Sequence, residues 1–199
     1  DYDQKVAQLK KEFSIFDEIV IGMVGTLCER KNQKLLIQIA DQLRQREVKF
    51  IVVGEDFTEE KKYKQELQAM IKNLNLEQQV ILAGFRRDVP QLMNLFDVLM
   101  VPSKREAFGL VAVEGMAASN AVVASNVDGL AEIIEHESDG LLVESDNKNS
   151  WVKVFDKLIK DKDLRNKLSI NAYESVKNKF SLDVMVDKTE KIYLDMIKE

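Results

Sequence analysis

The feature that most constrains the fold is a regular alternation of short apolar runs with longer amphipathic segments between residues 18 and 143. The apolar runs have the length of strands and are rich in Val and Ile, whereas the segments between them repeat with helical spacing. We expect strands at residues 18–24, 48–53, 80–83, 98–101, 121–124 and 140–143. Strands that alternate with helices form right-handed βαβ units. The sequence therefore predicts an α/β fold, with a Rossmann-like, doubly wound parallel sheet of about six strands.

The helices expected between these strands span residues 33–46, 59–74, 89–96, 110–118 and 130–135, and Asp88 is expected to cap the third of them. From residue 147 onward the pattern is helical, and the last helix, at about 181–198, begins with Ser181 as its N-cap. Residues 1 to about 17 form an amphipathic N-terminal helix. Because 199 residues suit one ordinary domain and no linker interrupts them, we predict a single domain over residues 1–199.

Composition excludes several classes of protein. The net charge is −5 and both signs are mixed along the chain, which argues against a nucleic-acid surface. No apolar run approaches the roughly 20 residues of a membrane span. One cysteine (Cys28) fits a reducing compartment, so we expect a cytoplasmic location, and one histidine (His136) gives little support for a metal site. The chain begins with Asp1, so we expect it to be a piece of a longer protein.

Two glutamates, Glu106 and Glu114, flank a predicted strand-to-helix turn that contains Phe-Gly-Leu. The free N–H groups at the start of the helix expected at 110–118 favour an anion. A carboxylate would repel a phosphate there, so each glutamate is better placed to accept hydrogen bonds from hydroxyls on either side. A diphosphate with hydroxyls at both ends describes a nucleotide sugar. The alternative is that the glutamates only cap the helix and keep the surface soluble.

The segment 102–114 closely resembles the donor-site signature of the retaining GT-B glycosyltransferases of the group 1 family, and the resemblance extends from about residue 19 to the C-terminus. In that family the first glutamate holds donor-sugar hydroxyls, the backbone after it binds the diphosphate, and the second glutamate holds the ribose. The resemblance gives these roles to Glu106, to the backbone of residues 108–111 and to Glu114.

The same resemblance implies one half of a GT-B fold, without the acceptor-binding N-terminal domain, so that this chain alone is inactive. The implied reaction is retaining transfer of a sugar from a nucleoside diphosphate, by default UDP, to an acceptor hydroxyl in polysaccharide or glycoconjugate biosynthesis. It requires no metal and no other cofactor. Membrane association of the full-length enzyme stays open.

The loop at residues 25–32 departs from the family in one position. The family has Gly-Arg-Leu and then a lysine, and both cations neutralise the diphosphate. Lys31 matches the lysine, whereas Thr26 stands where the arginine is expected, with Arg30 or Arg86 as candidate substitutes. Alternatively, Lys31 is a solvated lysine, although a cation near the positive end of a helix is disfavoured without an anion.

Two further loops match the family. In the loop at residues 84–90, Phe85 or Arg86 would border the base, unless this is an ordinary βα loop with solvated arginines. Residues 127–134, where the family usually has Gly in place of Asp128, and residues 139–143 are interpreted as a helix cap and a strand entry. We assign no chemical role to Cys28 or His136.

The predicted donor site has Glu106 and Lys31 as its catalytic residues and consists of Gly25, Thr26, Lys31, Phe85, Arg86, Glu106, Ala107, Phe108, Gly109, Leu110, Val111 and Glu114. Two other functions stay open. Thr26 in the arginine position supports a non-catalytic nucleotide- or sugar-binding module, and the third interpretation is a structural α/β interaction domain without a ligand. The sequence lacks the phosphate loop of many ATPases, the Gly-x-Gly-x-x-Gly of dinucleotide enzymes and the Gly-x-Ser-x-Gly of hydrolases. Phosphorylase chemistry has no candidate pyridoxal-phosphate lysine.

Overall fold

The computed structural model describes residues 2–198 and contains one six-stranded parallel sheet in the order β3-β2-β1-β4-β5-β6. The strands are β1 (Ile19–Val24), β2 (Val48–Val53), β3 (Val80–Gly84), β4 (Val98–Val101), β5 (Ala121–Ser125) and β6 (Leu141–Val143). All six expected strands are confirmed to within one residue at each end. The strand order reverses between β1 and β4, which makes this sheet doubly wound and sets a crevice at the carboxyl ends of these two strands.

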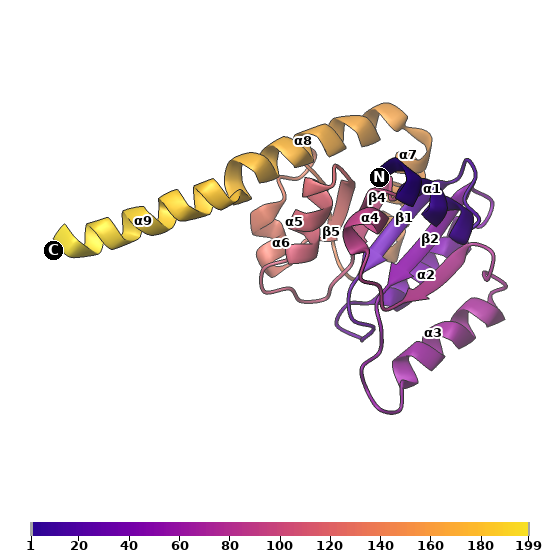
Figure 1. Ribbon diagram of the computed structural model, residues 1–199. Helices are drawn as coiled ribbons and strands as arrows, with labels where there is room; N and C mark the ends of the chain where they lie inside the picture. Colours follow the sequence, from indigo (N-terminus) through magenta and orange to yellow (C-terminus); the bar gives the residue numbers. More distant parts are fainter. Residues whose placement is uncertain (1, 199) are drawn as a thin grey trace.

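Helices cover both faces of the sheet (Figure 1). They are α1 (Tyr2–Glu12), α2 (Gln33–Gln42), α3 (Lys62–Asn73), α4 (Val89–Met93), α5 (Leu110–Ala117), α6 (Asp128–Ile133), α7 (Lys148–Lys160), α8 (Lys162–Phe180) and α9 (Leu182–Lys198). Val98 and Met100 of β4 pack in the core that contains Trp151 and Phe155 of α7. Leu99 and Val101 face the opposite core, with Leu9 of α1 and Met116 of α5. Burial on both faces explains why the strands are continuous apolar runs.

Several expected helices are shorter than the sequence pattern suggested. The helix expected at 33–46 ends at Gln42, where the amide of Leu43 bonds to Ile39 and Ala40 and the chain turns toward β2. The helix expected at 59–74 begins only at Lys62, because Lys61 has a left-handed backbone with φ of 48°. The helix expected at 89–96 ends at Met93 and continues as a tight turn through Leu95 and Phe96. The helix expected at 130–135 spans Asp128–Ile133.

The two expected N-caps have different outcomes. Ser181 accepts a 3.4 Å hydrogen bond from the amide of Val184, as a cap of α9 should. The prediction for Asp88 is wrong, because its side chain makes no cap hydrogen bond. The Asp88 carboxylate instead accepts two 2.8 Å hydrogen bonds from Arg86, and this ion pair outcompetes the backbone amides.

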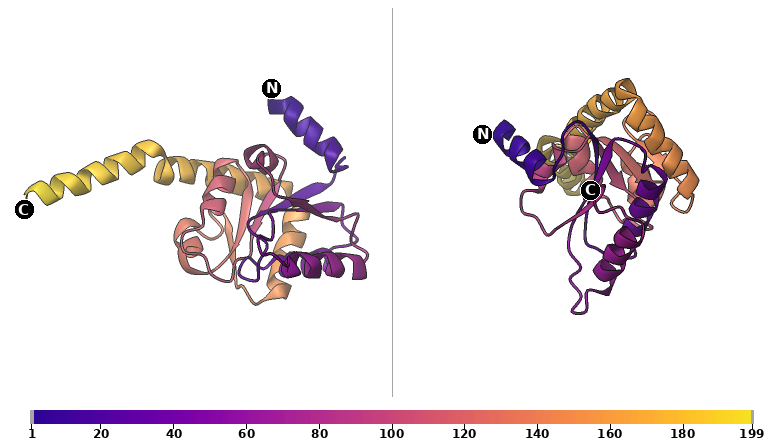
Figure 2. Two further views of the ribbon diagram at one scale, coloured as in Figure 1. Left: turned by 60° about the horizontal axis from the view of Figure 1, so that its bottom comes forward. Right: turned by 90° about the vertical axis from the view of Figure 1, so that its right-hand side faces the viewer.

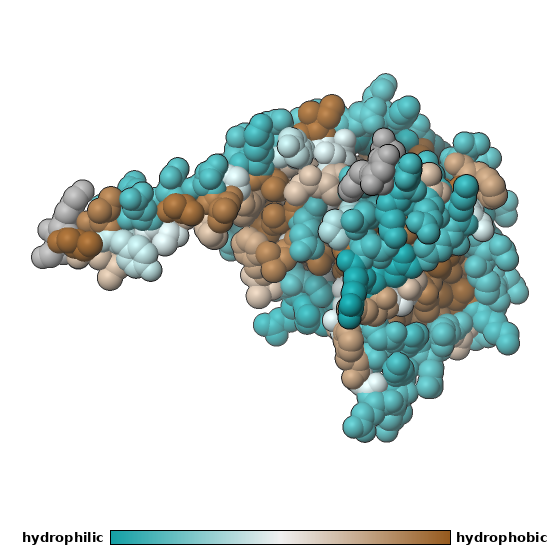
Figure 3. Space-filling model, viewed as in Figure 1, coloured by the Kyte–Doolittle hydropathy of each residue, from teal (hydrophilic) through white to brown (hydrophobic). Residues whose placement is uncertain are grey.

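The C-terminal helix α9 projects from the rest of the chain in Figure 1 and in the left view of Figure 2. Its apolar side chains stay exposed, among them Leu182 at 70%, Met196 at 69% and Ile197 at 80%. Figure 3 shows hydrophobic side chains along the projecting helix. Exposed apolar side chains gathered on one surface are a feature of interaction sites. Within residues 2–198, no helix is both long and apolar enough to cross a membrane. The single-domain assignment over residues 1–199 stays a prediction.

Candidate functional site

The predicted donor residues of two loops meet at the carboxyl ends of β1 and β4. These central strands are neighbours, with Ile21 opposite Val98. The loop at 25–32 follows β1 and the loop at 102–109 follows β4, and the amide of Lys104 donates a 2.9 Å hydrogen bond to the carbonyl of Arg30. The two loops are therefore held side by side at the crevice of the doubly wound sheet.

Two cations converge on one carboxylate in this crevice. Lys31 Nζ donates a hydrogen bond to Glu106 Oε2, and Arg30 Nη1 lies 3.6 Å from the same oxygen. Ser103, which is fully buried, donates from its hydroxyl to that oxygen at 3.1 Å. The side chains of Lys31 and Glu106 are only 12% and 14% exposed, whereas that of Arg30 is 52% exposed. The cluster holds one positive charge more than negative charge, so it attracts an anion.

The first turn of α5 lies directly after this cluster. Gly109 is the N-cap residue, with φ of +102°, a left-handed value that favours glycine. The first N–H groups of a helix, here those of Leu110 and Val111, have no partner within the helix. Together with the helix dipole they add to the positive potential of Lys31 and Arg30. This arrangement suits a phosphate.

Hydrogen bonds to the first residues of α6 hold the turn before α5 in place. The amide of Glu106 donates to Asp128 Oδ2 at 3.2 Å, and the amide of Gly129 donates to the carbonyl of Glu106 at 3.1 Å. A Cβ atom on Gly129 would lie 2.6 Å from the carbonyl oxygen of Ala107, so only glycine allows this approach. Asp128 has φ of +39°, which gives a physical reason for glycine at that position in the resembled family.

The loop after β1 is fixed by Gln33, a buried polar residue on the first turn of α2. Its Nε2 donates to the carbonyl of Thr26 at 2.9 Å, and its Oε1 accepts from the amide of Cys28 at 3.3 Å. The amide of Gly25 donates to Val53 in β2 at 2.9 Å. The Thr26 side chain itself is exposed. Sequence reasoning missed Gln33, although a glutamine among the apolar residues of a helix is a signal of such a role.

Glu114 lies apart from the cation cluster, on the exposed side of α5. It lines a cavity of about 480 Å³ between α4 and α5, whose other walls include Val89, Pro90 and Met93. This cavity is mainly apolar and has one carboxylate at its edge. Phe85, on the loop before α4, is 61% exposed and packs edge-on against Phe57, with 6.4 Å between the ring centroids.

Arg86 binds two carboxylates, one of which belongs to α1. Its guanidinium binds the carboxylates of Asp88 and Glu12 and lies 5.7 Å above the centroid of the Phe13 ring. These bonds raise the pKa of Arg86, and the hydrogen bonds from Arg86 hold the pKa of Asp88 below its usual value. Of the two arginines considered as substitutes for an arginine at position 26, Arg30 reaches Glu106 and Arg86 is engaged elsewhere.

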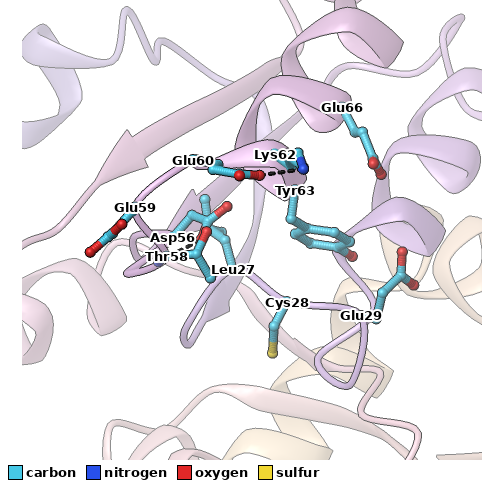
Figure 4. Close-up of a pocket in the computed structure, with 10 residues that line it drawn as sticks. All are labelled: Leu27, Cys28, Glu29, Asp56, Thr58, Glu59, Glu60, Lys62, Tyr63 and Glu66. Atoms are coloured by element: carbon cyan, nitrogen blue, oxygen red, sulfur yellow. Dashed lines mark hydrogen bonds and ion pairs between the residues drawn. The ribbon is translucent and has the colours of Figure 1, made fainter.

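A second cavity, of about 630 Å³, opens between the loop after β1 and the loop after β2 (Figure 4). Figure 4 shows Glu29 and Glu66 on one side of the Tyr63 ring, and Asp56, Glu59 and Glu60 on the other. Burial raises the pKa of Tyr63 to about 12. Although this cavity is the larger of the two, its carboxylates would repel a diphosphate, so we place the anion site at Lys31 and Arg30. Among the described residues, no three His, Cys, Asp or Glu side chains are grouped to hold a metal ion.

Comparison with known proteins gives a consistent result. The profile of the family "Glycosyl transferases group 1" matches residues 5–175. N-acetyl-alpha-D-glucosaminyl L-malate synthase of Bacillus anthracis is 28% identical over 202 residues, which cover 100% of this chain and 51% of the synthase. UDP-Gal:alpha-D-GlcNAc-diphosphoundecaprenol alpha-1,3-galactosyltransferase of Escherichia coli is 27% identical, covering 99% of this chain and 49% of that enzyme. The chain thus spans about half the length of these curated relatives.

Solved structures extend the comparison to the fold. HepE of Anabaena in complex with UDP superposes with a TM-score of 0.91 at 27% identity, over 96% of this chain and 53% of HepE. HepE has also been solved in complex with UDP-glucose, and that structure superposes with a TM-score of 0.89. The C-terminal domain of the group 1 family protein LpcC of Francisella tularensis superposes with a TM-score of 0.81 at 28% identity, over 92% of this chain and 94% of that domain.

Proposed function

Because the chain belongs to the glycosyl transferases group 1 family, we propose that it is the donor-binding half of a retaining glycosyltransferase that uses a UDP-sugar. The predicted family and the predicted half of a GT-B fold are both confirmed, by the match over residues 5–175 and by the similarity to half of HepE. The acceptor-binding half would be the remainder of a longer protein, as the twofold length of the curated relatives suggests.

The observation that carries the proposal is the cation cluster at the start of α5. Lys31 Nζ touches Glu106, and the free amides of the first turn of α5 follow directly after Glu106 in the chain. We place the diphosphate between Lys31 and these amides, in the segment from Phe108 to Val111. UDP and UDP-glucose bound to HepE support the choice of donor.

The two glutamates then take different parts of the donor. Glu106 would hold hydroxyls of the sugar, because it lies in the cation cluster at the end of β4. Glu114 would hold the ribose, because it lines the separate cavity between α4 and α5. The apolar wall of Val89, Pro90 and Met93 suits one face of a base.

In the proposed reaction the bond between the anomeric carbon and the diphosphate oxygen breaks, and the electron pair goes to the diphosphate. Lys31 and the amides of α5 would stabilise this developing charge, and such electrostatic stabilisation is often the largest contribution to catalysis. The acceptor hydroxyl, bound by the other half of the protein, would add to the anomeric carbon on the face that the diphosphate leaves, which retains the configuration, and its proton would pass to the departing diphosphate. We place the reaction in glycoconjugate biosynthesis, as the relatives suggest. We further propose a cytoplasmic location, in keeping with the unpaired Cys28.

A calorimetric titration of the 199-residue chain with UDP, GDP and ADP tests the proposal. We expect UDP to bind in the presence of EDTA, and Lys31→Ala to weaken UDP binding by about 1.5–3 kcal/mol, the range for a hydrogen bond to a charged group. Lys104→Ala is the matched control, because Lys104 is a nearby exposed lysine that pairs with Glu29 instead of Glu106. If no nucleoside diphosphate binds, the chain is an interaction domain and the proposal is wrong.

The separate roles of the glutamates are tested by Glu106→Gln and Glu114→Ala. Glu114→Ala should weaken free UDP, whereas Glu106→Gln should leave the affinity for free UDP nearly unchanged and slow sugar transfer in the full-length protein. The reverse order of the two UDP affinities would contradict the assignment. A full-length protein that binds UDP-sugar and never transfers the sugar would instead support the non-catalytic binding module, for which the exposed Thr26 is the argument.

A further inference from the structure

The guanidinium of Arg30 lies at the cation cluster and, within residues 2–198, has no acidic partner outside it. Among the described residues, Glu106 is the only carboxylate within 4 Å of Arg30, and the other bond of the guanidinium, at 3.3 Å, goes to the carbonyl of Arg105. Neighbouring cations differ in this respect. Lys34 pairs with Glu29 and Glu66, and Lys104 pairs with Glu29.

The net charge of the cluster depends on Arg30. Lys31 is in direct contact with the carboxylate of Glu106, and both side chains are largely buried. Lys31 and Glu106 alone therefore form a neutral pair with little attraction for a diphosphate, which carries two negative charges in a nucleotide sugar. The excess positive charge of the cluster comes from Arg30.

We infer that Arg30 is the second cation of the diphosphate site and supplies the charge that Thr26 does not. This inference rests on the proposed function. When a donor binds, the guanidinium of Arg30 turns from Glu106 to the diphosphate. The planar fork of the guanidinium can bind two phosphate oxygens at once. Arg30 thereby determines the preference of the site for a diphosphate over a monophosphate.

The geometry of the loop allows this movement. The Arg30 carbonyl is fixed by the amide of Lys104 at 2.9 Å, so the side chain starts from a fixed point between the two loops. The side chain is 52% exposed, so its reorientation requires no repacking of the core. Arg86 cannot play this part without leaving Glu12 and Asp88, which bind it together.

The test measures affinities for UDP and UMP by calorimetry in wild type, Arg30→Ala, Arg30→Lys and the charge-matched control Lys104→Ala. Arg30→Ala should weaken UDP by about 10- to 100-fold and UMP by less, since loss of a charge-assisted bond has this size. Lys104→Ala should change UDP affinity less than about threefold, as expected of an exposed ion pair. Arg30→Lys should lie between wild type and Arg30→Ala, because it keeps the charge and loses the fork.

A rescue variant completes the test. Thr26→Arg in the Arg30→Ala background should recover UDP affinity, because it returns a cation to the same loop. If Arg30→Ala binds UDP as Lys104→Ala does while Lys31→Ala is impaired, the inference about Arg30 is wrong and the proposed function stands. If wild type binds no nucleoside diphosphate, the proposed function fails and the inference fails with it.

Discussion

Gly129→Ala should weaken nucleotide binding, although residue 129 lies behind the proposed phosphate site. A Cβ atom at this position would lie 2.6 Å from the carbonyl oxygen of Ala107 and 2.7 Å from both the Cα and the carbonyl oxygen of Phe108. Ordinary contacts of a Cβ begin at 3.4 Å. The backbone of residues 107–108 must therefore recede by about 0.7–0.8 Å, because a backbone has no rotamer by which to avoid the methyl group.

The size of the effect follows from this displacement. A hydrogen bond of about 2.9 Å from an amide of this turn to a phosphate would lengthen to about 3.6 Å, beyond the range of a hydrogen bond. Loss of one bond to a charged group costs about 1.5–3 kcal/mol, which corresponds to a roughly 10- to 100-fold weaker affinity for UDP. The forced expansion should also lower the free energy of unfolding by about 1–3 kcal/mol.

The assay is calorimetric titration with UDP well below the melting temperature, together with urea denaturation. Gly140→Ala, at a glycine between α6 and β6, is the matched control. Its Cβ would meet the γ2 methyl of Ile134 at 2.7 Å and the carbonyl oxygen of Val122 at 3.1 Å, and it lies beyond the end of α6 and away from the turn before α5. Gly140→Ala should cost stability and leave UDP affinity near that of wild type. A folded Gly129→Ala variant with wild-type affinity for UDP would refute the reasoning.

Three further variants test the structure elsewhere. Arg86→Ala should lower the free energy of unfolding by about 1 kcal/mol at pH 7, the range for a partly exposed ion pair. Because the bond from Arg86 lowers the pKa of Asp88, this contribution is present above the unfolded pKa of about 3.9 and is lost as pH falls through the folded pKa, so urea denaturation should show the smallest difference from wild type at the lowest pH. Phe155→Ala, at a fully buried side chain beside Trp151, should cost about 3–5 kcal/mol in the same measurement. Gln33→Ala removes both side-chain bonds that fix the loop after β1, and it should weaken UDP in calorimetry while Gln65→Ala, an exposed glutamine on α3, leaves the affinity unchanged.

The strands could be predicted well from the sequence, because each one is buried on both faces and so appears as an uninterrupted apolar run. Ile51 of β2 contributes to one core and Phe50 to the other, and both side chains are fully buried. Helix ends were predicted less well, because they depend on the backbone conformation of single residues and on side-chain hydrogen bonds that hydrophobic spacing does not show. The left-handed Lys61 sets the start of α3, and the amides of Thr58 and Lys64 bind the carboxylate of Asp56, so residues 59–61 form a turn.

The proposed donor site likewise contains residues that the sequence indicated and residues that it did not. The sequence pointed to Lys31 and Glu106, and the structure brings these two side chains into contact across 75 residues of chain. The residues that hold the site were not foreseen. Ser103 is a short polar residue in a loop and Asp128 binds an amide 22 residues away, so nothing in the local pattern distinguishes either from a solvated residue. Gln33 stands among the apolar residues of a helix, and this signal was overlooked.

In the proposed function, the contact between Lys31 and Glu106 affects how the diphosphate and the sugar of the donor each contribute to the binding free energy. Without a donor, Lys31 and Glu106 pair with each other. A diphosphate that binds Lys31 would weaken this ion pair, so the net gain in binding free energy is the new interaction less the part of the old one that is lost. In the proposed function, sugar hydroxyls would compete for Oε2 of Glu106 with Lys31, Arg30 and Ser103, which all contact this oxygen. In this assignment free UDP would offer nothing in exchange at Glu106, whereas a UDP-sugar would supply hydroxyls at that carboxylate. The sugar should therefore add to affinity at this cluster beyond its own contacts, because it completes the exchange of partners that the diphosphate begins.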